Sequence, residues 1–219
     1  MKVGIIGAHG NIGLRLGTIL TDLGVETVGF IRKEEQASKL ESMGVKPEFA
    51  DIIDTPVDEY SKLLQGIDAL VFSAGAGGAG EEITKKIDGE GVEKMIKAAK
   101  NAGVKRFILV SAFPDALRDE NMPASFEFYM KMKRKADVDL VNSGLNWTII
   151  RPGTLTDEPG KGHVTIGSAI EYGDVSRDNV AAVIVELLNN DETSQLILEL
   201  TDGNVPIKEA VENQRRPLE

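Results

Sequence analysis

The chain has 219 residues, of which 42% are hydrophobic and 27% are charged, and its formal net charge is −10. This length and composition suit one domain with a sizeable core, whereas the acidic balance argues against nucleic-acid binding through a basic face. The chain contains no cysteine and two histidines, which excludes disulfides and thiolate chemistry and leaves no metal site expected.

The beginning of the chain predicts a strand, a glycine-rich turn and a helix. Residues 2–6 form an apolar run of strand type, and residues 12–23 repeat apolar side chains at the spacing of one buried helix face. At Gly7, Gly10 and Gly13, glycine permits a tight turn, close approach of the backbone to a pyrophosphate and close helix packing. The amides of a helix N-terminus favour such a diphosphate. We therefore expect dinucleotide binding, although a glycine triplet alone also fits a turn that binds nothing.

The end of the second predicted strand, residues 26–31, bears on which dinucleotide is bound. Arg32 and Lys33 follow this strand about 20 residues after the last glycine of the turn. A carboxylate at this point accepts a hydrogen bond from the ribose 2′-hydroxyl of NAD, whereas a cation pairs with the 2′-phosphate of NADP. The two cations favour NADP (as NADPH), with a solvated Arg–Lys pair as the alternative.

The rest of the chain alternates between helical and strand patterns. Helices are expected over residues 34–43, 57–64, 81–102, 125–142 and 174–188, the last capped by an acid, and strands over 69–72, 106–110, 147–150 and 195–200. Residues 160–173 show the least regular pattern. This alternation predicts an α/β fold with a doubly wound parallel sheet covered on both faces, a Rossmann fold. We expect one domain over residues 1–219, with 153–173 and 195–219 forming a small substrate-side portion.

A glycine-rich loop, residues 73–80, follows the predicted strand over residues 69–72. Ligands of open parallel sheets lie outside the carboxyl ends of the strands. The loop is therefore expected to border the cofactor, with a plain linker as the alternative.

Tyr129 and Lys133 form the candidate catalytic pair. They lie four residues apart on a predicted helix and therefore share one face. A nearby ammonium favours a phenolate, so the pair can pass a proton to or from a carbonyl or alcohol oxygen while a hydride moves at the neighbouring carbon. Lys133 would also bond the nicotinamide ribose, and Ser111, at a strand tip, would bond the substrate oxygen. The alternative is a chance Tyr–Lys spacing, but the pair follows both a nucleotide turn and a strand that ends in serine.

Several motifs along the chain match one known superfamily. They are the glycine turn of residues 7–13, Asp51-Ile52, Val71-Phe72-Ser73-Ala74-Gly75, Asp88 with Gly91, the stretch over residues 104–111, Tyr129-x-x-x-Lys133, Ala136-Asp137, Ser143-Gly144-Leu145, Thr148-Ile149-Ile150-Arg151-Pro152-Gly153 and Asp178-Asn179-Val180-Ala181. In these motifs the chain resembles the atypical short-chain dehydrogenase/reductase superfamily, in its small NAD(P)-binding branch of NmrA-like proteins and flavin and biliverdin reductases. The resemblance covers nearly the whole chain.

The resemblance implies a set of cofactor contacts. It assigns the pyrophosphate to Gly7, Gly10, Asn11, Ile12 and Gly13, and His9 stands in this turn where threonine is frequent. It assigns the 2′-phosphate to Arg32, beside Lys33, and the adenine to Asp51 and Ile52. Ser73, Ala74 and Gly75 would line the ribose side, and Pro152, Gly153 and Thr154, with Lys133, would contact the nicotinamide end. A second departure is Ala112, which follows Ser111 where a second serine is frequent.

The function expected from these residues is NADPH-dependent reduction of a small carbonyl, quinone or flavin-like substrate. A small or open pocket is expected between residues 75–80, 113–128 and 154–172. The alternatives are a non-catalytic NADP-binding redox-sensing regulator and an epimerase or isomerase with a tightly held cofactor. We expect a cytoplasmic monomer or homodimer that binds a small molecule and neither nucleic acid nor membrane, because no apolar stretch reaches membrane-spanning length.

Overall fold

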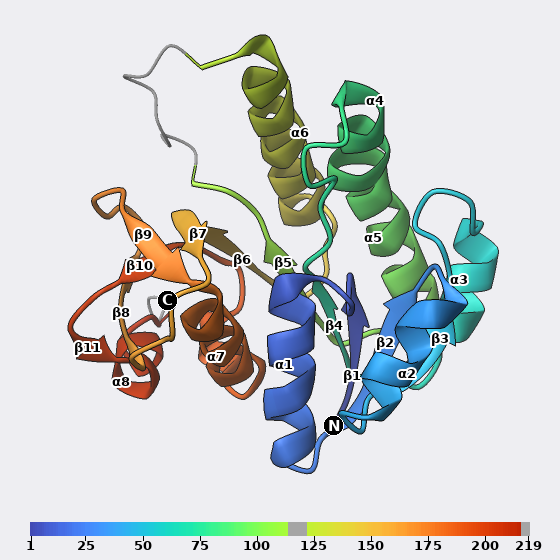
Figure 1. Cartoon of the computed structure of the whole chain (residues 1–219), viewed down its shortest axis with the longest axis horizontal. Coiled ribbons are helices and arrows are strands. Elements are labelled where there is room, and N and C mark those ends of the chain that lie inside the picture. The colour runs from blue at the N-terminus through green and yellow to red at the C-terminus, as the bar shows by residue number, and fades with distance from the viewer. Residues whose placement is uncertain (114–121, 216–219) are drawn as a thin grey trace.

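The computed structural model describes residues 1–113 and 122–215, and a nine-stranded sheet forms the centre of this part (Figure 1). Across the sheet the strands are β11 (Val205–Pro206), β8 (His163–Gly167), β10 (Leu196–Asp202), β6 (Trp147–Pro152), β5 (Arg106–Val110), β4 (Ala69–Phe72), β1 (Lys2–Ile6), β2 (Glu26–Ile31) and β3 (Lys46–Phe49). Neighbours from β10 to β3 pair in parallel, whereas β8 is antiparallel to β10 and β11. The predicted doubly wound parallel sheet is confirmed, with antiparallel strands added at one edge.

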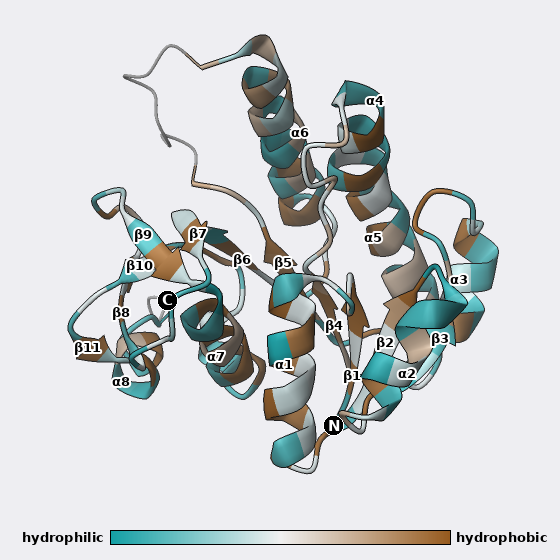
Figure 2. Ribbon diagram, in the orientation of Figure 1, coloured by the Kyte–Doolittle hydropathy of each residue, from teal (hydrophilic) through white to brown (hydrophobic). Residues whose placement is uncertain are grey.

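Helices cover both faces of this sheet (Figure 1). One face carries α1 (Asn11–Asp22), α2 (Ala37–Glu41), α7 (Arg177–Leu188) and α8 (Ile207–Glu212), and the other carries α3 (Val57–Leu63), α4 (Glu81–Thr84), α5 (Glu90–Ala102) and α6 (Ala124–Val141). Successive side chains of β5 alternate between the two cores: Phe107 and Leu109 pack on one side, Ile108 and Val110 on the other. Figure 2 shows the hydrophobic central strands that result. Within the described ranges, no helix is both long and apolar enough to cross a membrane.

The predicted helix over residues 174–188 begins later than expected. Its first three residues form β9 (Asp174–Ser176), which pairs in parallel with β7 (Thr154–Thr156). The helix is capped by serine and not by the expected acid, because the Ser176 hydroxyl accepts a hydrogen bond of 3.1 Å from the Asn179 amide. The irregular stretch before it contains β8, in which the buried Val164 and Ile166 alternate with three more exposed residues.

The predicted helix over residues 81–102 is not continuous. A π-helical turn, Lys85–Gly89, separates α4 from α5, and Asp88 is fully buried within it. Periodicity cannot reveal such a turn, since one extra residue per turn rotates the pattern without ending it. The predicted helix over residues 34–43 likewise starts with a 3₁₀ turn, Glu34–Gln36, ahead of α2.

Candidate functional site

The carboxyl ends of the parallel strands lie along one edge of the sheet. Ile6, the last residue of β1, is in register with Phe30 of β2 and with Phe72 of β4. Val110 of β5 is likewise in register with Ile150 of β6. The strand order reverses between β1 and β4, and the chain leaves these two strands toward opposite sides. A crevice at this point is where open α/β sheets bind their ligands.

The glycine turn after β1 depends on the missing side chains at two positions. Gly7 has a φ of +85°, and a Cβ there would lie 2.7 Å from the amide nitrogen of Ala74, in the loop that follows β4. A Cβ on Gly13 would overlap the Gly7 carbonyl oxygen and lie 2.8 Å from the Cα of Ala8. Helix α1 begins after Gly10 with no side-chain cap and no acidic residue in its first turn. The amides of this helix start therefore face no carboxylate of their own, which suits an anion.

Gly13 and Gly17 provide a matched test of this packing. Alanine at either position gains helix propensity of about 1 kcal/mol. At Gly17 the new Cβ meets the end of the Val45 side chain at 2.9 Å, whereas at Gly13 it meets backbone. Gly13→Ala is expected to lower the free energy of unfolding by about 1–3 kcal/mol more than Gly17→Ala, measured by urea denaturation. Equal effects would mean that the turn is not held by this close approach.

A cavity of about 310 Å³, the first cavity, lies between the ends of β1, β2 and β4. It gathers nine of the predicted cofactor residues: Gly7, His9, Gly10, Arg32, Asp51, Ile52, Ser73, Ala74 and Gly75. Gln36 also lines it, and its Oε1 accepts hydrogen bonds from the backbone amides of Arg32 and Lys33, each of 3.2 Å. Asn11, Ile12, Gly13 and Lys33 do not line the cavity. The ammonium of Lys33 instead lies 3.5 Å from Glu35 on the exposed surface.

The turn that carries Asp51 is held by a lysine from α5. Asp51 Oδ1 accepts a hydrogen bond of 2.6 Å from the Ile53 amide. Lys94 Nζ donates to the carbonyl oxygens of Ile52, Ile53 and Thr55 at 2.7, 2.9 and 2.8 Å. Burial lowers the pKa of Lys94, against the attraction of nearby acids. The wall of the first cavity is thus fixed by three carbonyl contacts to one ammonium.

Two further cavities continue the first along the sheet edge. The second cavity, of about 490 Å³, shares Gly75 and Ala76 with the first. The third cavity, of about 360 Å³, shares Phe126 and Tyr129 with the second. The third cavity also contains four predicted residues, Ser111, Pro152, Gly153 and Thr154. Part of the predicted pocket wall, residues 114–121, lies outside the described residues.

Lys133 is buried and lines none of the three cavities. Its Nζ donates a hydrogen bond of 2.9 Å to the carbonyl oxygen of Val110 and lies 3.5 Å from Asp88 Oδ1. The same ammonium lies 5.8 Å from the ring centroid of Tyr129. Burial by itself lowers the pKa of Lys133, but attraction to Tyr129, Asp88 and Asp137 outweighs burial and raises that pKa. The two residues of the predicted pair therefore lie close together, but only Tyr129 lines a cavity.

Asp88 connects this buried ammonium to the glycine-rich loop. Its Oδ2 accepts a hydrogen bond of 3.0 Å from the Ala76 amide, while Oδ1 faces Lys133. A single carboxylate thus links the loop after β4 to helix α6.

A second buried acid lies near Ser111. Asp137 Oδ2 is held by the Arg151 guanidinium at 3.0 Å from Nε and 2.9 Å from the terminal nitrogen. Burial raises the pKa of Asp137, whereas the Ser111 hydroxyl and the Arg151 guanidinium lower it. The Ser111 hydroxyl is therefore buried beside this carboxylate. The same described part of the chain contains no group of three or more histidine and acidic side chains suited to a metal ion.

The protein-family model described as NAD(P)H-binding matches residues 7–191. The chain belongs to this NAD(P)H-binding family. The match begins at the first glycine of the turn and includes α7, so it spans all three cavities. The resemblance to the atypical short-chain dehydrogenase/reductase superfamily is thereby confirmed.

Relatives of this NAD(P)H-binding chain carry both epimerase and reductase names. A Bacillus subtilis (strain 168) protein, named uncharacterized sugar epimerase YhfK, is 41% identical over 96% of this chain and 99% of its own. A putative NAD-dependent epimerase/dehydratase from Bacillus halodurans has a structure with a TM-score of 0.89 and 34% identity, covering 97% of this chain and 99% of that one. ChuY, an anaerobillin reductase from Escherichia coli O157:H7, has a TM-score of 0.79 and 25% identity, covering 94% and 98% of the two chains.

Four residues of the site had no role predicted from the sequence, namely Asp88, Lys94, Asp137 and Arg177. Asp88 belongs to a motif of the resemblance, but its inward direction depends on the π-helical turn. Nothing in the sequence separates Lys94 from the other lysines of its helix. Asp137 follows Lys133 by four residues, so their shared helix face was a usable signal. Arg177 lines the third cavity because it is the first residue of α7, and its place depended on where that helix begins.

Proposed function

We propose that the protein is an NADPH-dependent oxidoreductase that reduces a small carbonyl, quinone or flavin-like substrate. The observation that carries this proposal is the run of three cavities with shared walls, which starts at Arg32 and ends at Ser111 and Tyr129. A dinucleotide needs such a length, with a phosphate-binding end and a reactive end at separate strand tips.

In this proposal the first cavity takes the adenosine half of NADPH. The amides of residues 10–13 hold the pyrophosphate, and Arg32 pairs with the 2′-phosphate. Among the described residues, Arg32 forms no ion pair with an acid, so its guanidinium is available for an anion. Asp51 and Ile52 flank the adenine, and Pro152, Gly153 and Thr154 contact the nicotinamide end.

When bound, NADPH supplies a hydride to the substrate carbon. Tyr129 lies between the second and third cavities and donates a proton to the substrate oxygen. The hydride and the proton together convert a carbonyl to an alcohol. The buried Lys133 assists through its positive charge, since its own hydrogen bond goes to Val110. Ser111, which lines the third cavity, bonds the same substrate oxygen.

Epimerisation with a tightly held cofactor is the second candidate, because two relatives more than 30% identical carry epimerase names. An epimerase would use the same three cavities, but its cofactor would take a hydride from the substrate and return it to the same molecule. A regulator that binds NADP without turnover is the third. For all three we propose a cytoplasmic monomer or homodimer.

Calorimetry with NADPH and NADH, followed by NADPH oxidation across a panel of quinones, aldehydes and flavins, tests the proposal. We expect micromolar binding with a preference for NADPH and oxidation with at least one class of substrate. Binding without turnover on the whole panel would favour the regulator, and product formed without net NADPH consumption would favour the epimerase. If neither nucleotide binds, all three candidates are wrong.

A further inference from the structure

We propose that the third cavity selects an aromatic substrate that carries an anionic group, and that Arg177 binds the anion. This inference rests on the proposed function in one respect, namely that the third cavity receives the substrate. It adds the chemical class of that substrate and a residue that determines specificity.

The walls of the third cavity are suited to a flat ring. Phe113 and Tyr172 pack edge to face with their ring centroids 5.2 Å apart, and Phe126 and Tyr129 pack at 6.2 Å with their planes tilted by 39°. The Tyr172 hydroxyl shares a hydrogen bond of 2.6 Å with Thr154 Oγ1, which fixes one wall against β7. Aromatic rings presented in pairs favour another ring in stacked or edge-on contact.

Arg177 contributes the charge found among the described residues that line this cavity. Its side chain is 20% exposed, and its guanidinium lies 3.0 Å from Asp157 Oδ2. A partly desolvated guanidinium can bind a carboxylate or phosphate through two parallel hydrogen bonds. The net charge of −10 repels an anionic substrate. A local cation such as Arg177 is therefore needed to attract it.

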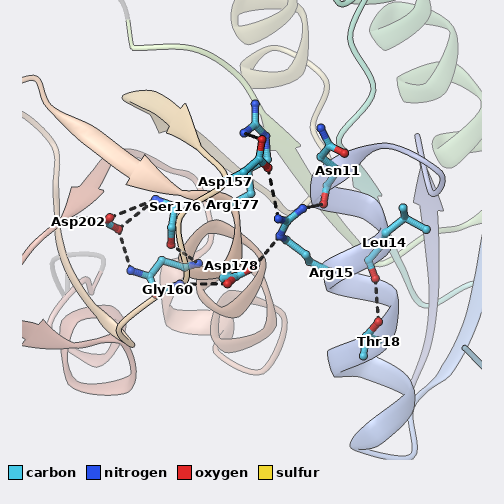
Figure 3. A network of polar contacts seen from close by, with 11 residues as sticks. Asn11, Leu14, Arg15, Thr18, Asp157, Gly160, Ser176, Arg177, Asp178 and Asp202 are labelled. Atoms are coloured by element: carbon cyan, nitrogen blue, oxygen red, sulfur yellow. Dashed lines mark hydrogen bonds and ion pairs between the residues drawn. The ribbon is translucent and has the colours of Figure 1, made fainter.

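Asp157 is a weak and shared partner of this guanidinium. It is 63% exposed and also lies 3.3 Å from Arg15, whose Nε is already bound to Asp178 at 2.6 Å (Figure 3). Exposed ion pairs of this kind contribute little to stability. The anionic group of a substrate in the third cavity therefore replaces Asp157 on Arg177, while Asp157 keeps its contact with Arg15.

Two substitutions with opposite expected effects test the inference. The measured quantity is kcat/KM for NADPH-dependent reduction of 4-carboxybenzaldehyde divided by that for 4-methylbenzaldehyde, a neutral compound of similar size. Arg177→Met is expected to lower this ratio by about 10- to 100-fold, because a charge-assisted hydrogen-bond pair is lost. Arg177→Lys should retain part of the ratio, and Asp157→Asn should raise it several-fold by removing the competing carboxylate. Ratios that stay the same in Arg177→Met and Asp157→Asn would overturn the inference.

A binding experiment keeps this inference separate from the proposed function. In protein saturated with NADP⁺, calorimetry compares 1-naphthoate with the neutral 1-naphthamide, and it needs no turnover. Tighter binding of 1-naphthoate that is lost in Arg177→Met supports the inference even if neither aldehyde is reduced. Equal affinities overturn it even if the enzyme reduces neutral aldehydes, in which case the proposed function stands. Thermal unfolding curves of both variants establish that the changes do not arise from lost folding.

Discussion

Replacing Arg32 with aspartate is expected to weaken NADPH binding by about 10- to 100-fold, while NADH binding changes much less. The variant lacks the charge-assisted hydrogen bond between the Arg32 guanidinium and the 2′-phosphate, which contributes about 1.5–3 kcal/mol to binding. The new carboxylate also repels the phosphate. Lys33→Asp is the matched control, because it makes the same change of charge one residue further on. Lys33 lies outside the first cavity and already faces Glu35 at 3.5 Å, so its loss should matter less.

Calorimetric dissociation constants for both nucleotides and both variants provide the measurement. Equal losses for NADPH and NADH in Arg32→Asp would contradict the assignment of this residue to the 2′-phosphate. The preference for NADPH should also decrease below about pH 6, where a phosphate monoester takes up its second proton and loses half of its charge. Because NADH has no 2′-phosphate, its affinity serves as the reference over the same range of pH.

Replacing Tyr129 with phenylalanine is expected to lower kcat by about 10²- to 10⁴-fold, the usual contribution of general acid catalysis, and to leave the affinity for NADPH nearly intact. The phenol has no counterpart in phenylalanine, whereas the ring that forms the wall between the second and third cavities is retained. Tyr172→Phe is the matched control in the opposite wall. Its hydroxyl contacts Thr154, so its loss should lower kcat far less.

Stopped-flow or steady-state NADPH oxidation with a substrate from the panel provides the readout. Unchanged turnover in Tyr129→Phe would remove this residue from the chemistry and leave Ser111 as the remaining candidate donor to the substrate oxygen. A parallel test at Lys133 is harder to interpret. Removing one member of a buried ion pair leaves Asp88 uncompensated, at a cost of about 3–5 kcal/mol that affects folding as well as catalysis.

Much of the fold was predictable because it depends on short, repeated signals. Most central parallel strands are runs of apolar residues that alternate with helices, whereas β3, with the sequence Lys-Pro-Glu-Phe, carries no such signal and was not predicted. The strand tips could therefore be placed along one edge, and with them Gly7, Arg32, Ser73 and Ser111. The Gly7 position was also predictable in kind, since its positive φ excludes most side chains.

The parts that escaped prediction depend on local competition or on contacts distant in sequence. Ser176 caps α7 because three residues before the helix pair with β7, a partner about 20 residues earlier in the chain. Asp88 turns inward because a π-helical turn adds a residue to the helix, and no period in the sequence reveals it. The role of Lys94 in holding the turn after β3 can be recognised only from its three carbonyl partners, which lie about 40 residues earlier in the chain. Roles that depend on such contacts require a three-dimensional structure.

The carboxylate that joins the loop amide of Ala76 to the Lys133 ammonium also constrains how the sequence can evolve. Replacing either residue alone leaves the other charge in the interior without the opposite charge that now lies 3.5 Å away. A lineage that abandons one of the two should therefore abandon both, through an intermediate of low stability. Descendants of this chain should accordingly carry both charges or neither.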